Sequence, residues 1–232
     1  MLGALPWLID GTSLSTNGGR WPVRAAADCA DRDDHTLGVA LVVYSRKQGT
    51  MAWGHASLRT VSCADGAVVD LEYETYRMSR WNAQMLRDEH AGEPFLDDAG
   101  YLDRLRGALV LFRNVDPVDR GWFGEAEAHN REVLELWLDR PQDELDAIAA
   151  AADRWYATQR DTLRARAPLD ARYRPLSTNC TTVFQRLLGV DDPPTMPFAW
   201  LRAEADDAQL RVLHPSHALV RRWDGLPTEV QR

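Results

Sequence analysis

Two alternating segments separated by a pair of turn residues constrain the fold of this chain more than any other feature. Residues 52–62 and 67–76 both alternate between polar and apolar side chains, and Asp65-Gly66 stands between them. An Asp-Gly pair between two such segments is a strong signal for a tight β-hairpin. The sequence therefore predicts an antiparallel hairpin in the first half of the chain.

The length of this turn also predicts the register of the hairpin. A two-residue turn pairs Ala64 with Ala67 and, counting outward, His55 with Tyr76. Glu74 is then the diagonal neighbour of His55, within reach of a long side chain. Glu72 takes that place if a bulge shifts the register.

Polar side chains recur on one face of the predicted hairpin. His55, Ser57 and Arg59 share a face because successive strand residues point to opposite sides. Glu72 and Glu74 share a face of the following strand in the same way. Such a row is typical of a functional site and equally of a solvent-facing strand, and the sequence leaves both interpretations open.

Strand signals come mostly early in the chain and the helix that bears Cys180 comes late, which predicts one α+β domain. Helical pieces are expected over 77–106, and a long helix over 141–166 with its apolar residues three or four apart. A short helix is expected from Cys180 to the position before Gly189. Further strands are expected at 37–44, 108–113 and 131–138.

Composition excludes some classes of protein. The 232 residues carry a net charge of −8 without a clustered basic patch, which argues against a nucleic-acid-binding surface. No apolar run approaches the roughly 18 residues of a membrane span. The N-terminal residues lack the basic region of a signal peptide, so we expect a cytoplasmic protein, or an exported one if the N-terminus is incomplete.

We divide the chain into an irregular N-terminal arm, a catalytic domain and a C-terminal extension packed on the same domain. The boundaries are 1–36, 37–190 and 191–232. The three cysteines are too few for a disulfide framework, so Cys29 and Cys63 are expected to be incidental thiols. No histidine has a partner at metal-ligand spacing, so we predict no metal and no cofactor.

Cys180 is the candidate nucleophile. Its helix has apolar residues three, four, seven and eight positions further on, so Cys180 shares an inward face, where a cysteine is usually a small buried hydrophobe. The helix start changes that interpretation, because Ser177, Thr178 and Asn179 are all N-cap residue types. A thiol on the first helical turn lies in a field that favours the thiolate.

His55 is the candidate base for this thiol, and Glu74 is the first choice for the carboxylate that orients the imidazole through Nδ1. Glu72 is the alternative. The backbone N–H of Cys180, helped by Asn179, is expected to stabilise an oxyanion.

At these residues the chain resembles the permuted papain-like thiol enzymes, which include the NlpC-type cell-wall peptidases and the lecithin:retinol acyltransferase family. It is most similar to the bacterial domain-of-unknown-function family numbered 4105, which has a Gly-His-x-x-Leu-Arg strand, a long late helix and an Asn-Cys helix start. The matching segments are Gly54-His55-Ala56-Ser57-Leu58-Arg59, the helix over 141–166 and Asn179-Cys180-Thr181. The resemblance spans roughly residues 37–190.

The resemblance implies an antiparallel sheet packed against a long helix and a short helix that bears the nucleophile. It also implies a nucleophilic Cys180, a base His55 and a third polar residue from the next strand. The expected function is a cysteine-dependent hydrolase of a peptide or amide bond. The alternatives are a lipid or thioester acyltransferase on the same site, and a non-catalytic module with a protein partner.

Overall fold

The computed structural model describes residues 36–44, 55–64, 67–80, 82–115, 133–138, 140–191 and 208–214. Six strands are present in these residues: β1 (Thr36–Tyr44), β2 (His55–Ala64), β3 (Ala67–Arg77), β4 (Leu109–Val115), β5 (Val133–Leu138) and β6 (Ala208–His214). The helices are α3 (Asn82–Glu89), the 3₁₀ helix η1 (Pro94–Asp97), α4 (Ala99–Arg104), α7 (Gln142–Arg164) and α8 (Cys180–Leu187). The α+β class predicted from the sequence is confirmed.

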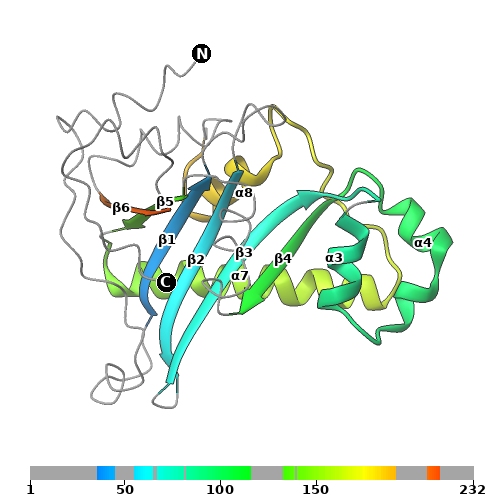
Figure 1. The fold of residues 1–232 in the computed structure, drawn as a ribbon, viewed down its shortest axis with the longest axis horizontal. Coiled ribbons are helices and arrows are strands. Elements are labelled where there is room, and N and C mark those ends of the chain that lie inside the picture. The colour runs from blue at the N-terminus through cyan, green and yellow to red at the C-terminus, as the bar shows by residue number, and fades with distance from the viewer. Residues whose placement is uncertain are drawn as a thin grey trace.

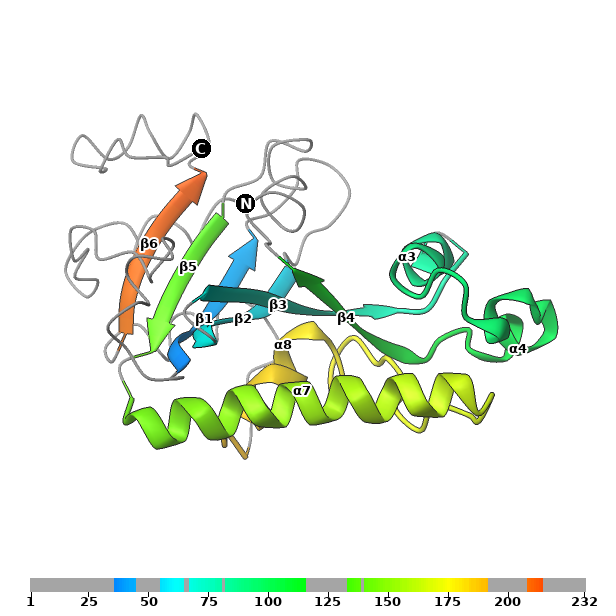
Figure 2. The same cartoon turned by 90° about the horizontal axis from the view of Figure 1, so that it is seen from below.

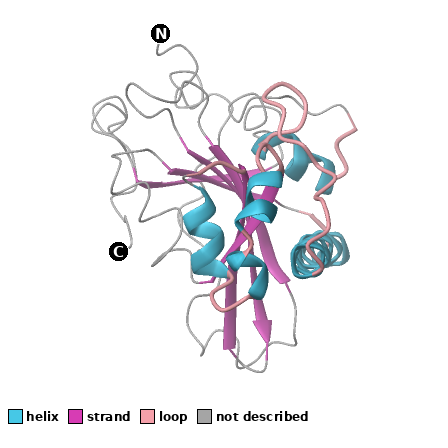
Figure 3. Ribbon diagram, turned by 90° about the vertical axis from the view of Figure 1, so that its right-hand side faces the viewer, coloured by secondary structure: helices cyan, strands magenta, loops and turns pink. Residues whose placement is uncertain are grey.

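The strands form one antiparallel sheet in the order β4-β3-β2-β1-β5-β6 (Figure 1). Helices α7 and α8 lie along one side of this sheet (Figure 2), and α7 contacts both β1 and β4. Viewed from the side of α3 and α4, the strands fan out behind these helices (Figure 3) because neighbouring strands are twisted relative to each other.

The predicted hairpin register is confirmed. Ala64 pairs with Ala67 at the turn end of β2 and β3, and Ser57 pairs with Glu74 near the other end. The turn residues themselves, Asp65 and Gly66, lie outside the described residues. A two-residue connection therefore sets which side chains of the two strands meet.

The polar row of this hairpin is buried. Arg59 and Glu72 both have an exposed fraction of 0%, and they face each other across the two strands. His55, Ser57 and Glu74 are also buried. The interpretation of this row as a solvent-facing surface is wrong. Buried charges are kept only where they are paired or hydrogen-bonded, so this face has to carry a polar network.

Side chains from two helices hydrogen-bond to the backbone of the edge strand β4. The amide of Gln159 on α7 accepts from the Leu111 N–H at 2.8 Å and donates to the Leu111 carbonyl at 2.7 Å. Glu89 of α3 accepts from the Arg113 N–H at 2.9 Å. Open strand edges invite pairing with other chains, and these contacts occupy the groups that would do so.

An apolar core fills the space between the sheet and the helices α3, α4 and α7. Its buried members are Met78, Leu86, Phe95, Tyr101, Leu105, Ala108, Val110, Phe112 and Leu163. Along its length, α7 also buries Leu145, Ile148, Ala152 and Tyr156 on one stripe, as its periodicity predicts. This packing holds α7 beside the sheet.

Candidate active site

The first turn of α8 is set by a capping box. Asn179 Oδ1 accepts from the N–H groups of Thr181 and Thr182, both at 2.9 Å. In return Thr182 Oγ1 accepts from the Asn179 N–H at 3.0 Å. Cys180 is therefore the first residue of the helix, where free N–H groups and the helix dipole favour negative charge.

The side chain of Asn179 is held in this cap at both ends, because its Nδ2 donates to the Pro175 carbonyl at 2.7 Å. Asn179 thus positions the start of α8 and Cys180 with it. From the sequence we expected Asn179 to help bind an oxyanion. In the structure its side-chain amide caps the helix and bonds to Pro175.

His55 is the first residue of β2, and its ring lies against Tyr76. The two ring centroids are 4.7 Å apart with an angle of 13° between the planes. This stacking follows from the register, which makes His55 and Tyr76 cross-strand neighbours. It restricts the imidazole to one plane.

Glu74 is the carboxylate next to this imidazole. Its Oε1 lies 3.5 Å from His55 Nε2. The sequence-based choice of Glu74 matches this placement, but the expected nitrogen, Nδ1, is wrong. Nε2 is at the outer end of the ring, so it reaches the diagonal residue Glu74.

Cys180 is a free cysteine with an exposed fraction of 7%, and its thiol forms a hydrogen bond with the His55 side chain. The Ala56 N–H also donates to the sulfur. Burial acts to raise the pKa of the Cys180 thiol, but the charge of His55 and these hydrogen bonds hold it below its usual value. The pair favours a thiolate.

The pKa of His55 moves in the opposite direction. Burial acts to lower it, but the negative charge and hydrogen bond of Cys180, followed by those of Glu74, raise it well above its usual value. A lowered thiol pKa and a raised imidazole pKa are the two sides of one coupled equilibrium. The structure therefore favours an ion pair between Cys180 and His55.

Glu74 is held in its charged form by three neighbours. Burial acts to raise its pKa, but His55, then Asn114 and Tyr76, lower it below the usual value. Asn114 Nδ2 donates to Oε2 at 2.9 Å, and the Tyr76 hydroxyl donates to Oε1 at 3.1 Å. Tyr76 thus contacts both the imidazole and its carboxylate.

Glu72, the alternative carboxylate, lies two pairs further along the hairpin, on the same face. Its Oε1 accepts from the Ser57 hydroxyl at 2.6 Å, and its Oε2 accepts from Asn114 Nδ2 at 3.3 Å. One amide therefore bridges the two buried glutamates. Glu74 has the contact with His55, and Glu72 supports the network beside it.

The sequence-based analysis missed Asn114 and Tyr173. Asn114 follows the predicted end of its strand at 113, and only the pairing of β3 with β4 brings it opposite Glu72. Tyr173 lies in the segment before α8, where burial and then the charge of Cys180 raise its pKa to about 12. Asn114 could have been found only by extending the predicted strand 108–113 by one residue. We see no sequence signal that points to Tyr173.

Cys63 corrects a further expectation, because it is disulfide-bonded at the end of β2 rather than an incidental thiol. Cys29 lies outside the described residues. The error has a simple cause: three cysteines do not predict a framework, but a single cross-link needs only two side chains that the fold brings together.

No protein-family model, no curated protein and no solved structure matches this chain. In the described part of the chain, no helix combines the length and the apolar character that a membrane crossing requires. Among the same residues, no three His, Cys, Asp or Glu side chains are grouped so that they could hold a metal ion. The site is therefore interpreted from its own chemistry.

Proposed function

We propose that this chain is a cysteine-dependent hydrolase of a peptide or amide bond, with the strand and helix arrangement of the permuted papain-like enzymes. Cys180 is the nucleophile, His55 the base and acid, and Glu74 the group that orients the imidazole. One observation carries this proposal: a free thiol at a helix start is hydrogen-bonded to a histidine whose pKa is raised while the thiol pKa is lowered. An incidental buried thiol has no such partner.

The reaction follows from these roles. The Cys180 thiolate attacks the acyl carbonyl carbon, and a C–S bond forms. The C–N bond then breaks, and the His55 imidazolium gives its proton to the leaving amine. Water, deprotonated by His55, attacks the thioester carbonyl. A C–O bond forms, the C–S bond breaks, the carboxylic acid leaves, and the Cys180 thiolate and His55 imidazolium are restored.

The negative oxygen of each tetrahedral intermediate needs a donor. The backbone N–H of Cys180 is a candidate, because the first N–H groups of a helix have no partner inside the helix. The positive end of α8 adds to this stabilisation. Asn179 contributes by fixing where the helix begins, through its bonds to Thr181 and Thr182.

Labelling with an electrophilic peptidyl probe tests this proposal. The native chain should be labelled on Cys180, and Cys180→Ser should not be labelled. Ser177→Ala is a matched control, since Ser177 is exposed and precedes the cap. Absence of labelling in the native, folded chain would contradict the enzyme and favour a non-catalytic module.

Substrate class is tested with the same acyl group offered as a peptide amide and as a thioester. A hydrolase of amide bonds should release the amine from the first substrate, and Cys180→Ser should abolish this release. Turnover of the thioester alone, with transfer of the acyl group to an added alcohol or amine, would contradict the amidase and support an acyltransferase.

A further inference from the structure

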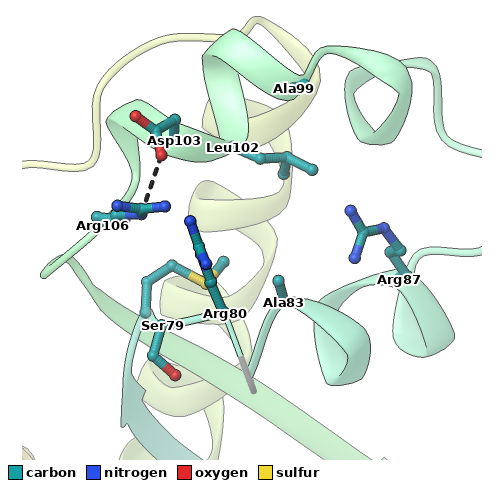
Figure 4. A pocket seen from close by; sticks show the side chains of 9 residues that line it. Ser79, Arg80, Ala83, Arg87, Ala99, Leu102, Asp103 and Arg106 are labelled. Carbon is teal, nitrogen blue, oxygen red and sulfur yellow. Dashed lines mark ion pairs between the residues drawn. The ribbon is translucent and has the colours of Figure 1, made fainter.

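A pocket of about 190 Å³ lies beside α3 and α4, apart from the candidate active site. It is bordered by the residues that follow β3, by one side of α3 and by α4 with the turn after it (Figure 4). Cys180, His55 and Glu74 do not line it. The proposed hydrolase leaves this pocket without a role.

Arginine dominates the charge of the pocket. Arg80, Arg87 and Arg106 line it, and Asp103 is the one acidic side chain among its lining residues. Arg106 Nε lies 2.9 Å from Asp103 Oδ1, so this acid is already used. In the part of the chain that the structure describes, Arg80 and Arg87 form no ion pair. This positive pocket is unusual in a chain whose net charge is −8.

The two unpaired arginines lie on either side of an apolar strip. Figure 4 shows Leu102 and Ala83 between the guanidinium groups of Arg80 and Arg87. Apolar walls strengthen the field of nearby charges because they exclude water. A ligand here would bind its anionic part to the arginines and a short apolar part to Leu102.

The pocket has a fixed side and an adjustable side. The turn that carries Arg106 is bonded to the residue that follows β3, since the Gly107 N–H donates to the Met78 carbonyl at 3.1 Å. Asp103 further restrains Arg106. Arg80 and Arg87 are exposed and can close on a bound group. Such a site is partly ordered before its ligand arrives, which reduces the entropy lost on binding.

We propose that this pocket binds the phosphate group of a small phosphate monoester. Three arginines and one aspartate leave two positive charges, which matches the roughly −1.5 to −2 of a phosphate monoester at pH 7. A carboxylate carries a single negative charge, so one of the two positive charges of the pocket would remain unmatched. A guanidinium group can also donate two parallel hydrogen bonds to two oxygens of one phosphate. At about 190 Å³ the pocket is smaller than the roughly 300–1,000 Å³ of a site for a drug-sized ligand, so it suits one such group.

Isothermal titration calorimetry with glycerol 3-phosphate at low salt tests this proposal on the full chain. Arg80→Gln and Arg87→Gln should each weaken binding about tenfold, the effect of losing one charge-assisted hydrogen bond. Arg154→Gln is the matched control, since Arg154 is an exposed arginine on α7 outside the pocket, and it should bind like the native chain. Both arginines are exposed, so thermal unfolding should stay unchanged.

Equal affinity in Arg80→Gln, Arg87→Gln and Arg154→Gln would overturn the proposal. The proposal would also be overturned if the native chain bound neither millimolar glycerol 3-phosphate nor vesicles that contain phosphatidic acid.

A second arm asks where the phosphate comes from. Phosphatidylcholine vesicles with added phosphatidic acid present the same monoester on a lipid surface. Sedimentation with these vesicles, lost in Arg80→Gln, would assign the group to a lipid headgroup, whereas binding of glycerol 3-phosphate alone would assign it to a soluble molecule. The rate of Cys180 alkylation should be the same in all three variants, which separates this pocket from the proposed catalytic site.

Discussion

Cys180 and His55 each favour their charged form because they are hydrogen-bonded to each other. Burial on its own keeps both groups neutral, because it disfavours the charged form of each. Their hydrogen bond and mutual attraction oppose this effect, and the thiol pKa falls while the imidazole pKa rises. The charge of this pair is therefore a property of two residues that are far apart in the sequence.

Replacing His55 with alanine should shift the pH dependence of Cys180 alkylation. In the native chain, reaction with iodoacetamide should persist well below the usual cysteine pKa of about 8.5, since His55 lowers the thiol pKa. His55→Ala removes that charge, so the midpoint should move to higher pH. The measurement is the alkylation rate of Cys180 across the pH range, followed by mass spectrometry.

Glu74→Gln is the comparison for this experiment. It should move the midpoint less than His55→Ala, because Glu74 contacts Nε2 and not the sulfur. If His55→Ala left the profile unchanged, Cys180 would not be paired with His55 and the proposed function would lose its main support.

At the scale of single elements, the start of α8 decides where the thiol lies. Asn179→Ala removes the cap, which typically costs about 0.5–2 kcal/mol of unfolding free energy. Asn179→Ser is the matched control, since serine also caps helices and should recover most of that loss. Urea unfolding measures both variants.

The same pair of variants bears on the chemistry. Loss of the cap should also raise the alkylation midpoint of Cys180, because the first turn would fray and its free N–H groups would no longer be aligned. Equal stability of the alanine and serine variants would show that the capping box does not hold this turn.

The edge strand β4 gives a second prediction at this scale. Gln159→Leu leaves the N–H and carbonyl of Leu111 without their partner, and each buried unsatisfied group costs about 1–3 kcal/mol. The free energy of unfolding should fall accordingly, and the Leu111 amide should exchange its hydrogen faster. Urea unfolding and hydrogen exchange by NMR measure the two effects.

Gln142→Leu is the control for the edge strand, because Gln142 lies on the same helix with its hydrogen bond to Asp146 exposed. A change within about 0.5 kcal/mol is expected there, as for most surface substitutions. A similar loss in both variants would mean that Gln159 does not protect the edge.

At the scale of the whole molecule, the disulfide of Cys63 adds a covalent restraint that the sequence analysis did not anticipate. Peptide mapping without reduction should yield Cys63 in a cross-linked peptide that separates on reduction, and Cys180 in an unlinked one. Disulfides persist mainly in oxidising conditions, so the protein has to be prepared without reductant for this measurement. Recovery of Cys63 as a free thiol from such protein would contradict the cross-link.

The sequence by itself determined the features that depend on neighbours along the chain. The turn length at residues 65–66 set the hairpin register, and with it the stacking of His55 on Tyr76 and the choice of Glu74. The cap residue types before Cys180 set the helix start, and Gly189 with its φ of 83° ended that helix. Each of these follows from hydrogen bonds and dihedral angles within a few residues.

Only the tertiary structure decided which interpretation of the polar row was right. The alternation of Arg59 and Glu72 is the same on a buried and on an exposed face, and only packing shows that both are buried. Asn114 reaches Glu72 and Glu74 because β3 pairs with β4. Cys63 forms a disulfide because the fold brings a second cysteine next to it. Contacts between distant residues depend on how the elements assemble, and local patterns do not record that assembly.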